Sequence, residues 1–136
     1  MQRIISFQKE IKFLSYIEFW EYISEEERIL TDVLRQLILQ HLPTHCKEKL
    51  VNNVPYFFGK RRICFIWPGS IPGGGFRKGV MLGFSFGNKL PDLENYLTHG
   101  TNKRIFYKIY NSVEELNEVP IVALLNEAIV VDSLYK

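Results

Sequence analysis

The sequence predicts an α+β fold in which an antiparallel meander sheet carries the N- and C-terminal helices on one face. Apolar residues recur at helical spacing in residues 13–41 and again after residue 112, whereas the residues between them alternate with the period of strands. Helices, then strands, then a helix is the element order of an α+β domain. The expected strands follow one another too closely for crossover helices, so we expect neighbouring strands to pair antiparallel.

Length and composition set the broad class. A chain of 136 residues that is 46% hydrophobic and 24% charged fits one globular domain over residues 1–136. The net charge of +2 argues against a dedicated nucleic-acid binder. Lys9, Glu10 and Lys12 interrupt the apolar run that a signal peptide would need, and no stretch is long enough to span a membrane. Two cysteines are too few for a disulfide framework, so we expect a cytoplasmic protein with free thiols.

Two helices are expected before residue 44. The first has apolar residues at helical spacing: Phe13, Ile17, Trp20 and Ile23. The second follows Ser24, which forms the signature of a capping box with Glu27. Its apolar face comprises Leu30, Val33, Leu34, Leu37, Ile38 and His41. Pro43 ends this helix, and residues 44–50 can form another short one.

Four strands are expected in the middle of the chain. Residues 54–58 and 62–67 form a hairpin with a charged turn at residues 59–61. Residues 68–78 contain three consecutive glycines but lack the Gly-Lys-Ser/Thr ending and the following helix of a phosphate-binding loop, so they indicate a flexible hairpin loop. Residues 79–86 and 104–110 alternate as the third and fourth strands. Ser112 and Glu115 resemble a capping box before the last helix, which has Pro120 in its first turn.

The segment 83–104 combines turn residues with many polar side chains, and it is the best candidate for a binding site. Residues 100–104 form a corner before the fourth strand. Gly100 and Asn102 permit unusual backbone angles, so consecutive amides around Thr101 could point the same way and form an anion-binding nest. Lys103 and Arg104 would hold the anion. Asp92 would fix the corner as a turn cap. Aromatic walls would come from three further residues: Tyr56, Trp67 and Tyr107. The same residue types also occur in turns that only reverse the chain.

These features favour a non-enzymatic module that binds a small anionic ligand or a protein partner. Three alternatives stay open. An acidic helical surface could bind iron, a hard cation that prefers carboxylate oxygens, through Glu18, Glu21, Glu25, Glu26 and Asp32. A nucleic acid could bind Lys60, Arg61, Arg62, Arg77 and Lys78. The third alternative is an enzyme, but the candidate nucleophiles Ser85 and Cys64 have no histidine nearby in sequence. The spacing of His41, His45 and Cys46 fits no usual zinc site.

Two segments of the chain resemble the YdhG-like family of bacterial domains. Lys49, Leu50, Pro55 and Phe57 match its first motif, in which Asn52 stands where Trp is usual and Asn53 where Gly is usual. The second motif is matched by Gly87, Leu90, Pro91, Asp92, Gly100, Thr101, Lys103 and Arg104, with Asn102 in place of Gly. The resemblance implies a frataxin-like α+β fold and iron-chaperone-like relatives. The missing Trp implies an altered cleft.

Overall fold

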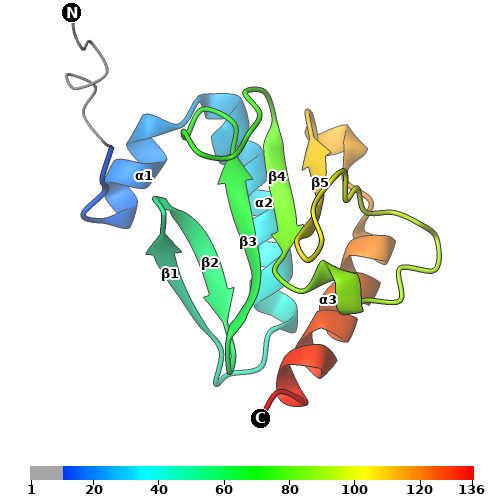
Figure 1. Ribbon diagram of the computed structural model, residues 1–136. Helices are drawn as coiled ribbons and strands as arrows, with labels where there is room; N and C mark the ends of the chain where they lie inside the picture. Colours follow the sequence, from blue (N-terminus) through cyan, green and yellow to red (C-terminus); the bar gives the residue numbers. More distant parts are fainter. Residues whose placement is uncertain (1–10) are drawn as a thin grey trace, which may run out of the picture.

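The computed structural model describes residues 11–136 (Figure 1). It contains three α-helices: α1 (Tyr16–Tyr22), α2 (Glu25–His41) and α3 (Glu118–Ser133). Five strands lie between α2 and α3: β1 (Lys47–Val51), β2 (Val54–Phe58), β3 (Arg62–Pro68), β4 (Val80–Phe84) and β5 (Phe106–Tyr110). Two short 3₁₀ helices follow β4 and β5: η2 (Gly87–Lys89) and η3 (Val113–Glu115).

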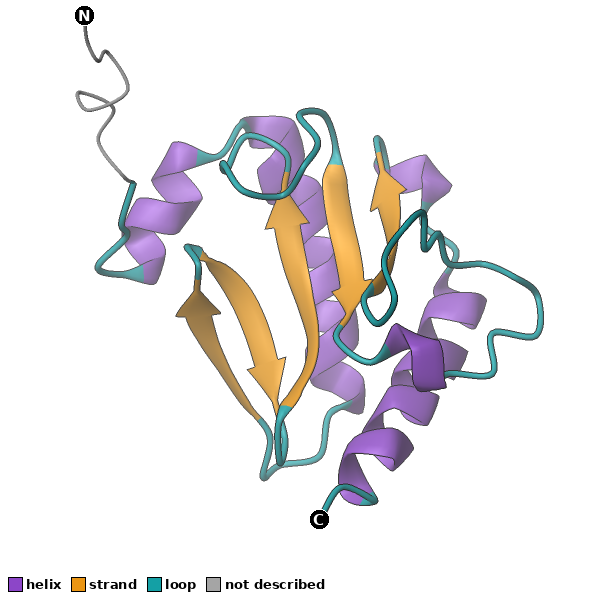
Figure 2. Cartoon of the chain, in the orientation of Figure 1, coloured by secondary structure: helices purple, strands orange, loops and turns teal. Residues whose placement is uncertain are grey.

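The five strands form one antiparallel meander in the order β1-β2-β3-β4-β5, which confirms the predicted fold class. Figure 2 shows α2 crossing behind the sheet, and both α2 and α3 contact β3. The core on this face joins Leu34 and Ile38 of α2 to Leu82 of β4 and Leu125 of α3, and all four are at most 1% exposed. We call the opposite side of the sheet the open face.

The helix α1 departs from the expectation that the terminal helices share one face. Its buried residue Phe19, together with Ile23 just after it, packs in a second core on the open face, with Val54, Trp67 and Ile71. Of the predicted apolar row, Phe13, Trp20 and Ile23 pack in this core, and Ile17 departs from it, because it is 68% exposed. Ile17 lies beside the exposed Glu18 and Glu21 on this short helix, so the 3–4-residue spacing alone could not show that it is exposed.

The segment predicted as a short helix over residues 44–50 is instead strand β1, from Lys47 to Val51. The cause is the turn that follows it. Asn52 and Asn53 have positive φ angles of 55° and 70°, the backbone of a tight two-residue hairpin turn, and asparagine tolerates that conformation well. The turn folds residues 47–51 back along β2, where Lys49 pairs with Tyr56.

The two predicted capping boxes differ in the structure. Ser24 and Glu27 form the predicted box at the start of α2. Ser112, by contrast, makes no side-chain cap hydrogen bond, and α3 begins later with Asn117 as its N-cap. The Glu115 side chain accepts a hydrogen bond from the Asn111 amide, which holds η3 as a separate turn. Pro120 lies in the first turn of α3, as predicted.

Two buried carboxylates attach helices to the loops of the sheet. Glu27, 6% exposed, accepts hydrogen bonds from the Ser70 amide at 2.8 Å and from the Ser70 hydroxyl at 2.7 Å, besides capping α2. Asp132, also 6% exposed, accepts hydrogen bonds from the amides of Lys60 and Arg61. The start of α2 is thereby fixed to the β3–β4 loop, and the end of α3 to the β2–β3 turn.

Candidate functional site

A cleft of about 400 Å³ opens on the open face, and its volume lies within the range of small-ligand sites. Strands β2, β3, β4 and β5 supply its floor, and the loop after β3 and the corner before β5 supply its walls. We call it the aromatic cleft. Its lining residues are Tyr56, Phe65, Trp67, Gly73, Gly74, Gly75, Phe76, Met81, Asn102, Ile105, Tyr107 and Ile109.

The floor of the aromatic cleft is organised by strand register. Phe65 pairs with both Tyr56 and Gly83, and Gly83 pairs with Tyr107, so these four residues form one row across the sheet. The Phe65 ring lies in the space above Gly83, where a Cβ would come within 2.2 Å of it. The same ring stacks on Tyr56 with 4.9 Å between the ring centroids. Glycine at this position of β4 therefore leaves the space that the Phe65 ring occupies while it stacks on Tyr56.

The glycine-rich loop forms one wall of the aromatic cleft. The Trp67 indole N–H donates a hydrogen bond to the Ile71 carbonyl at 2.9 Å, which fixes the ring against the loop. A Cβ on Gly73 or Gly74 would approach the indole to 3.0 or 2.8 Å, so the glycines allow the backbone to lie against the ring. The sequence predicts only a flexible hairpin loop for this run. Its proximity to Trp67, six residues before the first glycine of the run, was the signal that could have placed it at the site.

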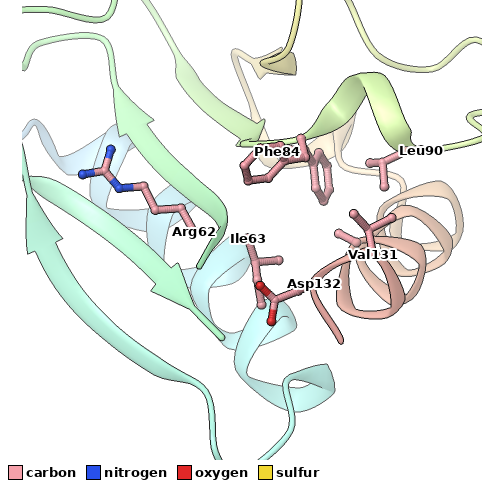
Figure 3. A pocket seen from close by; sticks show the side chains of 8 residues that line it. Arg62, Ile63, Phe84, Leu90, Val131 and Asp132 are labelled. Atoms are coloured by element: carbon pink, nitrogen blue, oxygen red, sulfur yellow. The ribbon is translucent and has the colours of Figure 1, made fainter. Parts of the chain in front are cut away.

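Cationic side chains surround the Tyr56 end of the aromatic cleft. The Arg62 guanidinium carbon lies 5.1 Å from the centre of the Tyr56 ring, and Figure 3 shows the Arg62 side chain pointing away from Phe84, Leu90 and Val131. Arg104 lies over the Phe86 ring at 4.8 Å, and the Lys49 amine lies 4.9 Å from the Phe58 ring. In the described part of the chain, the one salt bridge joins Arg35 to Glu48. The three cations are therefore without an acidic partner in residues 11–136.

Both burial and the neighbouring charges shift the pKa of the Tyr56 phenol. Burial raises its pKa above the ordinary tyrosine value, because the phenolate would lose hydration. A hydrogen bond with the Asn52 side chain and the charges of Arg62 and Arg104 act in the opposite direction. Both arginines therefore contribute a positive field at this end of the aromatic cleft. Asn52, which stands where the resembling family has Trp, contacts the same phenol.

Only one of the predicted corner residues lines the aromatic cleft. Asn102 lines the aromatic cleft, whereas Gly100, Thr101 and Lys103 are exposed and do not line it. Gly100 has a φ of 51°, and a Cβ there would lie 3.8 Å from the Tyr107 hydroxyl oxygen. Asn102 has no positive φ, and its amide donates to the His99 carbonyl at 2.8 Å. The predicted nest of free amides is therefore wrong at Asn102, because a hydrogen-bonded turn uses that amide.

Asp92 serves the corner as a turn cap. Its two carboxylate oxygens accept hydrogen bonds from the Tyr96 and Leu97 amides at 2.8 and 2.9 Å. Asp92 lines a different groove, between residues 91–96 and α3. The aromatic cleft therefore unites Tyr56, Trp67, Tyr107 and Asn102, with Arg104 at its edge, while Asp92 acts at a distance from it.

The acidic residues of the iron alternative do not converge. Glu18 and Glu21 lie on α1, Glu25 and Glu26 on the first turn of α2, and Asp32 accepts a hydrogen bond from Gln36. Within residues 11–136, no three His, Cys, Asp or Glu side chains are grouped so that they could hold a metal ion. His41, His45 and Cys46 therefore form no metal-binding group either. Cys46 and Cys64 are both free thiols.

A second, much smaller cavity lies between α3 and the sheet, beside Ile63, Phe84 and Asp132 (Figure 3). Its volume of about 10 Å³ is no larger than one water molecule requires. It is a packing gap in the core and has no room for a ligand.

Comparisons with protein-family models, with curated proteins and with solved structures found no match. None of the helices in residues 11–136 has the length and apolar character needed to cross a membrane.

Proposed function

We propose that the protein is a binding module for a small anionic ligand that has a planar apolar part. The observation that carries this proposal is the convergence of Tyr56, Trp67 and Tyr107 on one cleft, where the charges of Arg62 and Arg104 act on the Tyr56 phenol. Neither arginine has an acidic partner among the residues that the structure describes. Aromatic side chains favour planar apolar groups. Guanidinium groups grip a carboxylate or phosphate in two places.

The aromatic cleft has few groups suited to catalysis. Its lining, within the described part of the chain, includes neither a histidine nor a carboxylate, and Ser85 and Cys64 are buried residues outside it. Burial raises the pKa of the Cys64 thiol, which disfavours the nucleophilic thiolate. These observations support binding as the proposed function. The resemblance to the YdhG-like family is part of the same proposal, and the positive φ of Asn53, where that family has Gly, agrees with it. No observation favours the iron alternative.

Phenyl phosphate is a suitable probe because it joins an aromatic ring to a dianion. The titration would be followed by fluorescence in a Trp20→Phe background, which leaves Trp67 as the one tryptophan. We expect phenyl phosphate to quench the Trp67 fluorescence saturably. The double variant Arg62→Gln/Arg104→Gln should bind at least tenfold more weakly. The control Lys12→Gln/Lys136→Gln, whose positions are exposed, should bind with little change in affinity. An unchanged Trp67 signal, or equal loss in both double variants, would refute the proposal.

A further inference from the structure

The net charge of +2 conceals a strong separation of charge along the fold. Residues 47–110, which contain the whole sheet, hold eleven Lys and Arg against three Asp and Glu, a net charge of +8. Residues 11–46 and 111–136, which contain the three α-helices, hold four against eleven, a net charge of −7. An overall charge close to zero therefore does not exclude a polyanion partner for the sheet.

Most of this basic excess lies on the open face, where α1 adds two exposed carboxylates, Glu18 and Glu21. The strand register places Lys47, Lys49 and Arg62 on this face with Tyr56 and Phe58. Glu48 is the one acidic residue in the five strands, and it faces α2, where it pairs with Arg35 at 2.7 Å. The loop that walls the aromatic cleft adds Arg77 and Lys78, and the corner adds Lys103 and Arg104, all four exposed. Residues 69–79 and 98–107, which contain this loop and this corner, include no Asp or Glu.

The cations and the aromatic residues follow the direction of the strands. Arg77 lies on the loop that packs on Trp67, near the end of β3. Arg62 is the first residue of β3, at the opposite end of the strand. Five residue steps from Arg62 to Trp67 span about 16 Å of strand. Tyr107, Phe76 and Phe58 are half-buried, so each keeps part of its ring accessible along this path. Basic groups at both ends of an aromatic surface fit a linear polyanion that has planar groups.

From this arrangement we infer that the open face binds single-stranded nucleic acid, with an unpaired base in the aromatic cleft and phosphates on Arg62, Arg104 and Arg77. The inference depends on the proposed function, because it assigns the ligand class of the same cleft. Stacking of bases on aromatic side chains of an antiparallel sheet, with phosphates on flanking cations, is a general mode of single-strand recognition. A duplex keeps its bases stacked inside and cannot place one in a cleft. An acidic peptide would use the cations but not the rings.

Fluorescence anisotropy with a fluorescein-labelled thymidine decamer tests this inference. We expect binding at low salt that is at least tenfold tighter than binding to a duplex of the same length. Binding should weaken with salt, and the log–log slope should fall by about 1.4 in Arg62→Gln/Arg104→Gln, at roughly 0.7 per lost phosphate contact. Tyr107→Ala should weaken binding about tenfold through lost stacking, and the control Lys12→Gln/Lys136→Gln should keep both affinity and slope.

The two proposals fail in distinguishable ways. If phenyl phosphate binds in the aromatic cleft and the decamer does not, the inference is overturned and the proposed function stands. If neither binds, both are overturned. Polyglutamate, a polyanion without planar groups, is a further probe. If the duplex or polyglutamate binds as well as the decamer, or if Tyr107→Ala binds the decamer unchanged, charge alone accounts for the binding and the inference is wrong.

Discussion

Gly83 determines how the floor of the aromatic cleft is built, because the Phe65 ring occupies the space that a Cβ would need. We expect Gly83→Ala to lower the free energy of unfolding by about 1–3 kcal/mol, the usual cost of overpacking a core. Urea denaturation measures this loss. The second-site change Phe65→Leu should restore part of it, since the smaller side chain leaves room for the added methyl group. A Gly83→Ala variant of unchanged stability would show that the ring is not confined in this way.

Glu27 is the residue that links a helix cap to the wall of the aromatic cleft. Glu27→Gln can still cap α2, since glutamine also serves at this position, but it loses one oxygen that accepts from Ser70. We expect a loss of about 1.5–3 kcal/mol, the range for hydrogen bonds to charged groups. Chemical denaturation measures the loss, and hydrogen exchange should show faster exchange at the Ser70 amide. The exposed neighbour Glu26→Gln is the matched control, and an equal effect in both variants would contradict the role of Glu27.

At the scale of elements, α2 is held to the sheet by a narrow row of fully buried side chains. Leu34 and Ile38 are 0% exposed and Leu30 is 3% exposed, whereas Val33 is 39% exposed. We expect Leu34→Ala to cost about 2–5 kcal/mol, as other core truncations do. The control Leu39→Ala, at a position that is 41% exposed on the same helix, should cost far less. Equal losses in denaturant titrations would mean that the assigned face is wrong.

Elements with long, regular patterns could be predicted from the sequence, and shorter ones could not. The face of α2 follows from spacing, because one side of this helix must be buried. The alternation of β4 follows from the period of a strand, and the structure buries both of its faces. The strand β1 could not be recognised, since its pairing depends on the Asn52–Asn53 turn and on the neighbouring β2. The start of α3 was missed because Asn117 and Ser112 are both good N-cap residues, and only the surrounding structure selects between them.

The candidate site was predictable in its chemistry but not in its shape. Tyr56, Trp67 and Tyr107 can be grouped from the sequence, because each lies on an expected strand next to the turn-rich segments. Phe65 and the glycine run were missed, since a ring lying on Gly83 and a backbone lying on Trp67 are contacts between strands and loops. Asn102 lines the aromatic cleft but offers no free amide to it, because the amide completes a turn with His99.

For the molecule as a whole, buried acids of high pKa predict a loss of stability in alkaline solution. Burial raises the pKa of Tyr16, Tyr110 and Cys64 above their ordinary values. The unfolded chain releases these protons from about pH 8.5 for cysteine and about pH 10 for tyrosine. The folded state then binds more protons than the unfolded state, so the free energy of unfolding decreases as pH rises above these values and is unaffected below them.

The slope of stability against pH tests this assignment. Each such group contributes up to about 1.4 kcal/mol per pH unit. We expect Tyr110→Phe to reduce the slope above about pH 10, whatever it does to stability at neutral pH, where the Tyr96 hydroxyl loses its partner. The unsubstituted protein, measured over the same pH range, is the reference. Parallel slopes in the variant and the unsubstituted protein would contradict the origin proposed for the slope.

The separation of charge between sheet and helices makes this protein an electric dipole even though its net charge is small. A dipole rotates in the field of a charged surface before it makes contact, so the molecule would meet a polyanion with the open face beside the aromatic cleft and a polycation with α2 and α3. Two molecules at low ionic strength would orient head to tail by the same attraction, which salt screens within about 10 Å at 0.1 M. On ion-exchange columns, each pole would bind the resin of opposite charge. The protein would therefore be retained on both cation and anion exchangers at a pH where the isoelectric point alone predicts weak binding to either.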